Sequence, residues 1–227
     1  MEMMQDGSIN RRRMLGGLAM GGAMLALPGC MSVPGFGLTD AIKRILTLSS
    51  QTAFANLTSP DGFWDSSVAR IGLPAMFRGG GLASTLLTSG PVKNQLQKAL
   101  NNVAEDGAER AAPLVADAIR NISFTDAAAI IGGGPTAATG FLRQNMGSTL
   151  VSAMVPALGD AMKVANNPIL SQAIAALSGV DVGGVAQALS SDVDNAIWAE
   201  MGLAESEIRA NPESTNDPML IAVLKAT

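Results

Sequence analysis

Few residue types that could carry out chemistry are present in this chain of 227 residues, which has no His, no Tyr and a single Cys. These counts exclude Ser-His-Asp and Cys-His catalysis, His-ligated metal ions and haem, Cys-cluster metal sites and internal disulfides. Carboxylates, hydroxyls, Arg and Lys remain. We therefore expect no metal ion and no cofactor, and we expect any catalysis to rest on carboxylates.

Carboxylates alone are sufficient for glycan-cleaving enzymes, which use a pair of them on either side of the scissile bond. The candidates are Glu105 and Glu109, spaced to share one helix face, and Glu200, Glu205 and Glu207, which lie close to Trp198 in the sequence. Carboxylates interleaved with other charges are more typical of a solvated helix face. We favour a protein without catalysis and keep a carboxylate-based hydrolase of cell-wall glycan as the alternative.

Two further features could bind an anion. Gly132, Gly133 and Gly134 precede a predicted helix, whose N-terminal N–H groups can hold a phosphate, but the Gly-Lys-Ser or Gly-Lys-Thr ending of a phosphate loop is absent. We therefore interpret the glycines as a helix stop and a tight turn. Arg143 and Arg209 are candidate interaction residues, and for both we favour an ion pair with a neighbouring helix over a ligand.

The N-terminal segment has the three parts of an export signal: a polar start, an apolar stretch and a small-residue end. Arg11, Arg12 and Arg13 lie in the polar start, and residues 15–27 are apolar but too short to span a bilayer. Residues 10–15 resemble the twin-arginine export consensus. We expect export by this route, with the general secretory route as the alternative.

The single cysteine ends this segment. Leu27, Pro28, Gly29 and Cys30 resemble the bacterial lipobox, in which cleavage before the cysteine leaves it as the lipid-modified N-terminus. Several acyl chains on one residue hold a protein stably on a membrane. The residue after Cys30 is Met31 and not an Asp, so the sorting rules known for lipoproteins of enteric bacteria indicate the outer membrane. We therefore expect a lipoprotein on the periplasmic side, anchored through Cys30.

These patterns divide the chain into a signal peptide (residues 1–29), a lipidated tether (30–37) and a helical domain (38–227). Removal of the signal, with its three basic and two acidic residues, would change the net charge from −4 to −5. A negative chain is a poor partner for nucleic acid. The expected partners are the membrane, through the lipid, and an envelope protein or a ligand.

Apolar residues recur at helical spacing along most of the remaining chain, and aromatic residues make up only 4%. This pattern predicts an all-α fold, a single bundle-like domain of about seven to nine short helices. The predicted boundaries are an N-cap at Thr39, a stop at residues 59–62, a helix start at Pro91, a start or kink at Pro113, capping boxes at 123–126 and 191–194, and an end at Asn211-Pro212.

Three blocks of sequence, in the same order along the chain, carry a resemblance to a known family. They are residues 62–74, residues 130–143 and residues 205–212. Their motifs V-x-I-x-L-P, I-L-x-G-G-x-x-A-A-T and I-R-x-N-P resemble those of the bacterial domain of unknown function (DUF) 4197, over residues 38–224. The resemblance implies a secreted helical protein without an established activity, and it assigns no catalytic residue.

Together these observations favour a lipid-anchored, non-catalytic module that binds a partner or supports the envelope. A carrier of a small apolar ligand, held between the helices, is a third hypothesis beside the hydrolase.

Overall fold

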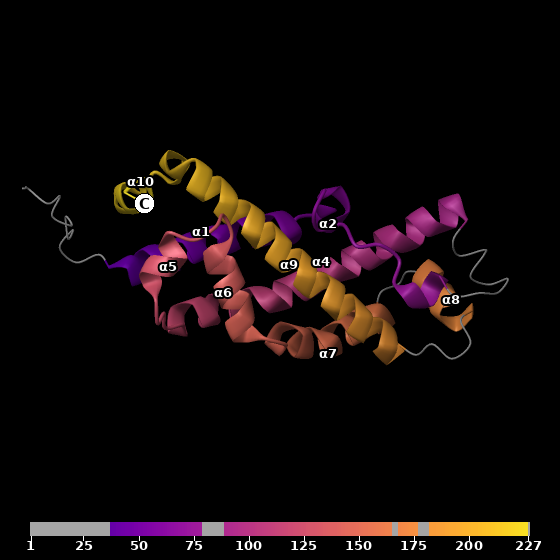
Figure 1. Cartoon of the computed structure of the whole chain (residues 1–227). Helices are drawn as coiled ribbons and strands as arrows, with labels where there is room; N and C mark the ends of the chain where they lie inside the picture. The colour runs from indigo at the N-terminus through magenta and orange to yellow at the C-terminus, as the bar shows by residue number, and fades with distance from the viewer. Residues whose placement is uncertain (1–36, 79–88, 165–167, 177–181, 227) are drawn as a thin grey trace, which may run out of the picture. The chain divides into compact units, whose positions relative to one another are not determined.

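Four helices form the centre of the fold: α1 (Leu38–Leu57), α4 (Gly90–Asn121), α7 (Thr149–Val164) and α9 (Val182–Ala210). The computed structural model describes residues 37–78, 89–164, 168–176 and 182–226 (Figure 1). α1 and α7 each pack against both α4 and α9, and these two long helices also touch each other. The predicted signal peptide, the lipobox and all of the tether except Gly37 lie outside the described residues.

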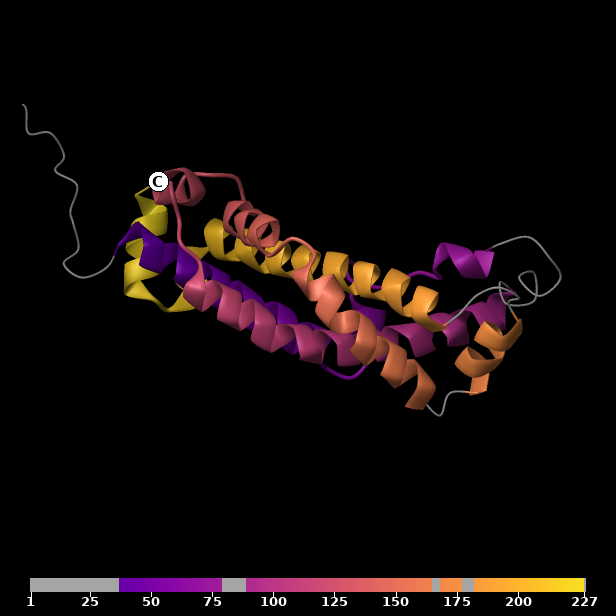
Figure 2. The same ribbon diagram turned by 90° about the horizontal axis from the view of Figure 1, so that it is seen from below.

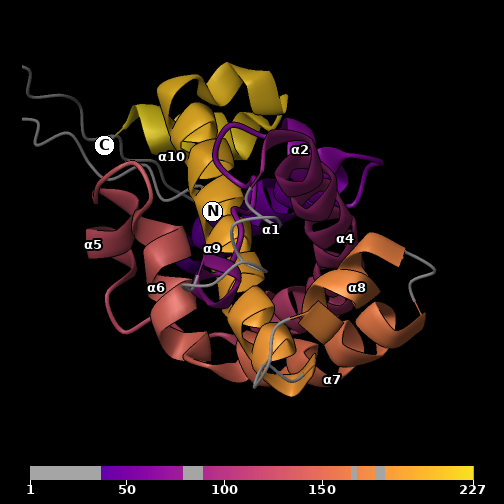
Figure 3. The same cartoon turned by 90° about the vertical axis from the view of Figure 1, so that its right-hand side faces the viewer.

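Shorter elements cover this four-helix core. They are α2 (Gly62–Asp65), the 3₁₀ turn η1 (Ala75–Arg78), α5 (Ala127–Ile131), α6 (Ala137–Met146), α8 (Pro168–Ala176), the 3₁₀ turn η2 (Pro212–Thr215) and α10 (Pro218–Lys225). Figure 2 shows the long helices running beside one another, and Figure 3 shows α5 and α6 on one side of α9 with α2, α4 and α8 on the other. The described residues contain no strand, so the all-α prediction is confirmed.

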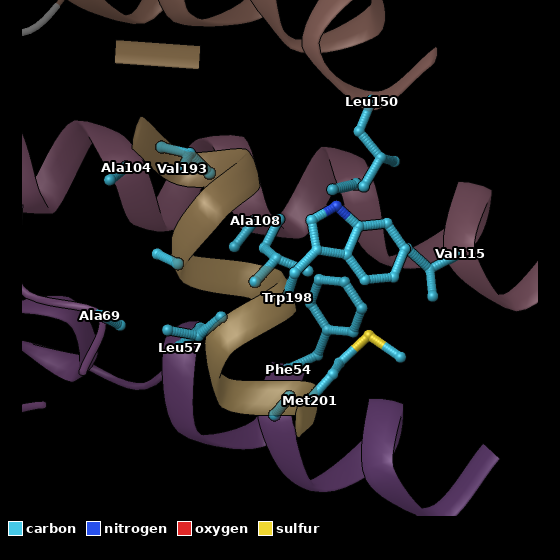
Figure 4. Close-up of a cluster of buried hydrophobic side chains, with 14 of the residues drawn as sticks. Phe54, Leu57, Ala69, Ala104, Ala108, Val115, Leu150, Val193, Trp198 and Met201 are labelled. Atoms are coloured by element: carbon cyan, nitrogen blue, oxygen red, sulfur yellow. The ribbon is translucent and has the colours of Figure 1, made fainter. Parts of the chain in front are cut away.

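The core is aliphatic, as the small number of aromatic residues requires. Trp198 of α9 is the large exception: it is 4% exposed and lies among Phe54, Val115, Leu150 and Met201 (Figure 4). The methionines at 146, 154 and 162 are buried too, as expected for core residues. No helix in the described part of the chain is long and apolar enough to cross a membrane.

Two predicted helix starts, at Pro113 and at the capping box of residues 191–194, are wrong. Pro113 lies inside α4, and Ser191 lies inside α9 with its hydroxyl bonded back to the carbonyl of Gln187 at 3.1 Å. A proline inside a helix costs about 3 kcal/mol, and a serine prefers a cap. In both helices the buried stripe continues past the unfavourable residue, for example from Ala111 to Val115 in α4, and the burial of these side chains outweighs the local cost.

Two predicted caps move by a few residues. α1 begins one residue before Thr39, because the N–H of Gly37 donates to the carboxylate of Asp40 at 3.1 Å. α5 begins after Asp126, not after Ser123, and the Asp126 carboxylate accepts the N–H of Ala129 at 2.9 Å. The start of α4 at Pro91 is confirmed within one residue.

Candidate functional site

A buried carboxylate of α9 holds two small helices in place. Glu205 is fully buried, and its oxygens accept the N–H groups of Ala138 at 3.0 Å and Thr139 at 2.7 Å, in the first turn of α6. The positive end of a helix favours a negative charge at this position. The anion position at this helix start is thus filled by the protein itself. Gly132, Gly133 and Gly134 form the turn between α5 and α6, as the sequence predicts.

Arg209 completes this arrangement one helical turn later in α9. Its Nε donates to Glu205 at 2.8 Å, and its two terminal nitrogens donate to the carbonyls of Ile131 at 2.7 Å and Ile130 at 3.1 Å. These carbonyls end α5, where a positive charge is favoured. Arg209 therefore forms its ion pair within α9 and not with a neighbouring helix as predicted, and it reaches the neighbouring helix α5 through hydrogen bonds to the two carbonyls.

Arg143 of α6 contacts α9 at residues 194 and 195, closer to the start of that helix than Arg209. Its Nη2 donates to Asp194 at 3.3 Å and to the side-chain oxygen of Asn195. Asp194 also accepts the indole N–H of Trp198 at 2.8 Å. Burial raises the pKa of Asp194, and the bonds from Trp198 and Arg143 oppose this shift. Because the Arg143 side chain stays 44% exposed, part of its guanidinium is accessible to solvent.

The segment between α2 and η1 is fixed by two polar side chains that the sequence analysis did not single out. Ser66 donates to the buried Glu200 of α9 and accepts the N–H groups of Val68 and Ala69. Asn101 of α4 accepts the N–H of Ile71 at 2.8 Å and donates to its carbonyl at 2.9 Å. The sequence does contain a signal for Asn101, because it is a polar residue within the apolar stripe of a predicted helix.

These bonds shape an open groove along one face of α9. One part, of about 660 Å³, lies between α9 and residues 68–75, and an adjoining part, of about 450 Å³, lies between α9 and α6. Val68 and Ala199 line both parts, so we call the two together the α9 groove. Its surface is made mainly of small side chains, with Arg70 on one side and Arg143 on the other. This groove is the candidate functional site.

The five candidate carboxylates do not converge on this groove or on one another. Glu200 bonds Ser66, Glu205 bonds α6, and Glu207 is exposed. Glu109 is exposed in α4 beside α7, in a shallow depression with Asp106, Arg110 and Asp160. Among the described residues, no three Asp, Glu or Cys side chains are placed to hold a metal ion.

Glu105 of α4 has the most perturbed carboxyl group. Its pKa is raised to about 7, first by burial and then by the charges of Asp61 and Asp106, while the backbone N–H groups of Asp61 and Gly62 lower it by less. Asp61 begins α2 in a left-handed conformation and pairs with Lys98 at 3.0 Å. Glu105 is therefore a source of pH-dependent stability in the neutral range.

Replacement of Glu205 by Gln tests the role of the buried ion pair. Loss of the carboxylate leaves Arg209 buried without its counter-charge, so we expect the free energy of unfolding to fall by about 3 kcal/mol. The matched control is Glu207→Gln, two residues along the same helix and exposed, for which we expect a change within about 0.5 kcal/mol. Urea unfolding measures both, and equal stabilities of the two variants would contradict the assignment.

Replacement of Glu105 by Gln tests the raised pKa. Between about pH 4.5 and pH 7 the unfolded chain loses this proton while the folded chain keeps it, so the native protein loses stability as the pH rises through this window. The variant lacks this loss and should be more stable than the native protein at pH 8, by about 1 kcal/mol after screening by solvent. Thermal melting from pH 5 to 8 measures this, with the exposed Glu109→Gln as the control. Parallel pH profiles for Glu105→Gln and the native protein would rule out the shift.

Comparison with known proteins places the chain in a family. No curated protein and no solved structure matches it. The model of a family described as a protein of unknown function (DUF4197) matches residues 35–225, a range that contains every helix described above. The blocks at residues 130–143 and 205–212, which suggested the resemblance, meet in space through Glu205 and Arg209. The chain therefore belongs to the DUF4197 family.

Proposed function

We propose that this protein is a lipid-anchored, non-catalytic binding module of the bacterial envelope, and that the α9 groove is its binding surface. The observation that carries this proposal is the construction of the groove. It is an open surface of small side chains, and each element beside it is tied to α9 or α4 by a buried polar bond. A surface held in one conformation before its partner arrives loses little conformational entropy on binding.

The buried carboxylates support a binding role over hydrolysis. A glycosidase needs two carboxyl groups facing each other across a cleft, about 5 to 10 Å apart. Here Asp194 bonds Trp198, Glu200 bonds Ser66 and Glu205 bonds α6, so each serves a different element of the fold. The groove is also open along the surface of α9, whereas a carrier of an apolar ligand encloses most of its cargo.

The anchor would define where the module works. Seven residues separate Cys30 from the start of α1 at Leu38, and an extended chain of this length spans at most roughly 25 Å at 3.3–3.6 Å per residue. The helical domain would therefore stay close to the membrane surface. Its partners would be proteins of the periplasm or of the same membrane.

Replacement of Cys30 by Ser tests the anchor. We expect loss of labelling by radioactive palmitate and release of the protein into the soluble fraction, because the serine oxygen cannot replace the sulfur that carries the lipid. Export should stop when Arg11 and Arg12 are both changed to Lys, with the precursor held in the cytoplasm. Membrane retention of the unlabelled Cys30→Ser variant would contradict the anchor, and unchanged processing of the arginine variant would indicate the general secretory route.

A photo-activated crosslinker tests the binding surface. Placed at Ala199, an exposed residue that lines both parts of the groove, it should give discrete adducts in intact cells. The matched control is Ala55, an exposed alanine of α1 that does not line the groove and should give no such adducts. Absence of adducts from position 199 would contradict the binding role. Release of soluble fragments from purified cell-wall sacculi, lost in Glu105→Gln, would favour the hydrolase.

A further inference from the structure

One edge of the α9 groove has the properties of a β-strand without a partner. From residue 70 to 73 exposure alternates: Arg70 and Gly72 are exposed, while Ile71 and Leu73 are each 4% exposed. Asn101 of α4 binds both the N–H and the carbonyl of Ile71. In an extended chain the backbone groups of successive residues point to opposite sides. The alternating exposure is that of an extended chain, so we expect the backbone groups of Gly72 to face away from Asn101, and Gly72 lines the groove.

The backbone of Gly72 is available to another chain. Its N–H and carbonyl make no hydrogen bond with any residue in the described ranges. A β-carbon built on Gly72 would meet no atom within 4 Å, so the space on the side-chain side of this residue is open. Neighbouring strands lie about 4.8 Å apart, and the part of the groove that Gly72 lines has a volume of about 660 Å³. On the opposite side of the groove, α9 presents the small side chains of Ala188 and Ala199.

The charges beside this edge indicate what the added strand carries. Arg143 is held in place by its Nη2, while its Nε and Nη1 make no hydrogen bond within the described parts of the chain. Arg70 is fixed by a bond from its Nε to the carbonyl of Trp64 and stacks over the Trp64 ring at 4.7 Å. Asp192 also lines the groove. Two positioned guanidinium groups beside the groove favour a partner with a carboxylate at this place.

A third polar group points to a ligand in the part of the groove beside α6. Thr139 is 3% exposed and lines this part together with Arg143. Its hydroxyl oxygen is buried and has no hydrogen-bond partner among the described residues. A buried hydroxyl without a partner costs free energy, and a rotation of the Thr139 side chain that turned the hydroxyl into the groove would let a polar group of the bound chain offset this cost.

From these contacts we infer that the α9 groove binds an extended peptide segment of another envelope protein. The segment adds as a strand to the Gly72 edge and places a carboxylate on Arg143. Main-chain hydrogen bonds supply affinity in this mode, and side-chain contacts supply specificity. This inference rests on the proposed binding function and specifies its partner.

Selection from a displayed library of random linear dodecapeptides, against the mature lipidated protein in lipid nanodiscs, tests the inference. We expect the enriched peptides to share an Asp or Glu. Synthetic copies should lose binding about tenfold or more when Arg143 is changed to Gln, because charge-assisted hydrogen bonds are lost. Ala199→Leu, which fills the groove from an exposed helix position, should also abolish binding, while the control Ala55→Leu should not affect it.

Two measurements separate strand addition from contacts by side chains alone. N-methylation of alternate peptide amides should prevent binding in one register and leave it unchanged in the other, since only every second residue pairs with the edge. Hydrogen exchange at Gly72 should slow when the peptide binds. Equal tolerance of both methylated registers, or unchanged exchange at Gly72, would overturn strand addition.

Full binding by Arg143→Gln would overturn the carboxylate contact. The inference as a whole would be overturned if the selection enriched no peptide, or if Ala199→Leu abolished the binding of none of the enriched peptides. In that case adducts from position 199 in cells would still support the binding module, so the two proposals fail separately.

Discussion

The carboxylate of Glu205 is the contact on which the candidate site depends. It lies at 0% exposure within α9 and is shared by the first turn of α6 and by Arg209, which in turn holds the last carbonyls of α5. Removing a charge from water is costly, and a buried pair is tolerated only when its remaining hydrogen-bonding groups are satisfied. Here two helix ends supply those partners. The position of α6, and with it the position of Arg143 beside the groove, follows from this one carboxylate.

Two other buried carboxylates of α9 hold neighbouring parts of the fold in the same way. Asp194 binds Trp198 and Arg143, and Glu200 binds Ser66 at the start of the segment that forms the other wall. Each bond is directional, so each fixes a neighbouring element against a helix whose aliphatic contacts alone would allow it to slide. The exposed face of α9 between these attachments is left with small side chains such as Ala188 and Ala199. The groove is the space along α9 between residues 68–75 on one side and α6 on the other, and the buried bonds hold both in place.

Sequence periodicity was sufficient for the fold class, because a stripe of apolar residues on a helix is a local property. The helix starts predicted from Pro113 and from the capping box at Ser191 were wrong, because local preference and burial oppose each other there and only the packed structure shows which is larger. The site was harder to predict for a different reason. Glu205 meets Ala138 across 67 positions of sequence, and Asn101 meets Ile71 across 30. The family motifs contain several of these residues, but a motif does not state which of its residues touch.

The unpaired edge at Gly72 requires its own explanation, since exposed edges invite aggregation. Here the edge is short, because Pro74 follows two residues later and has no N–H to donate. Residues of α9 line the groove opposite this edge. The lipid anchor proposed for Cys30 would bring the protein and its partners to one membrane surface, where short tethers give effective concentrations on the order of millimolar. Under those conditions a short edge with a few main-chain bonds and one carboxylate contact would be sufficient for recognition without a deep pocket.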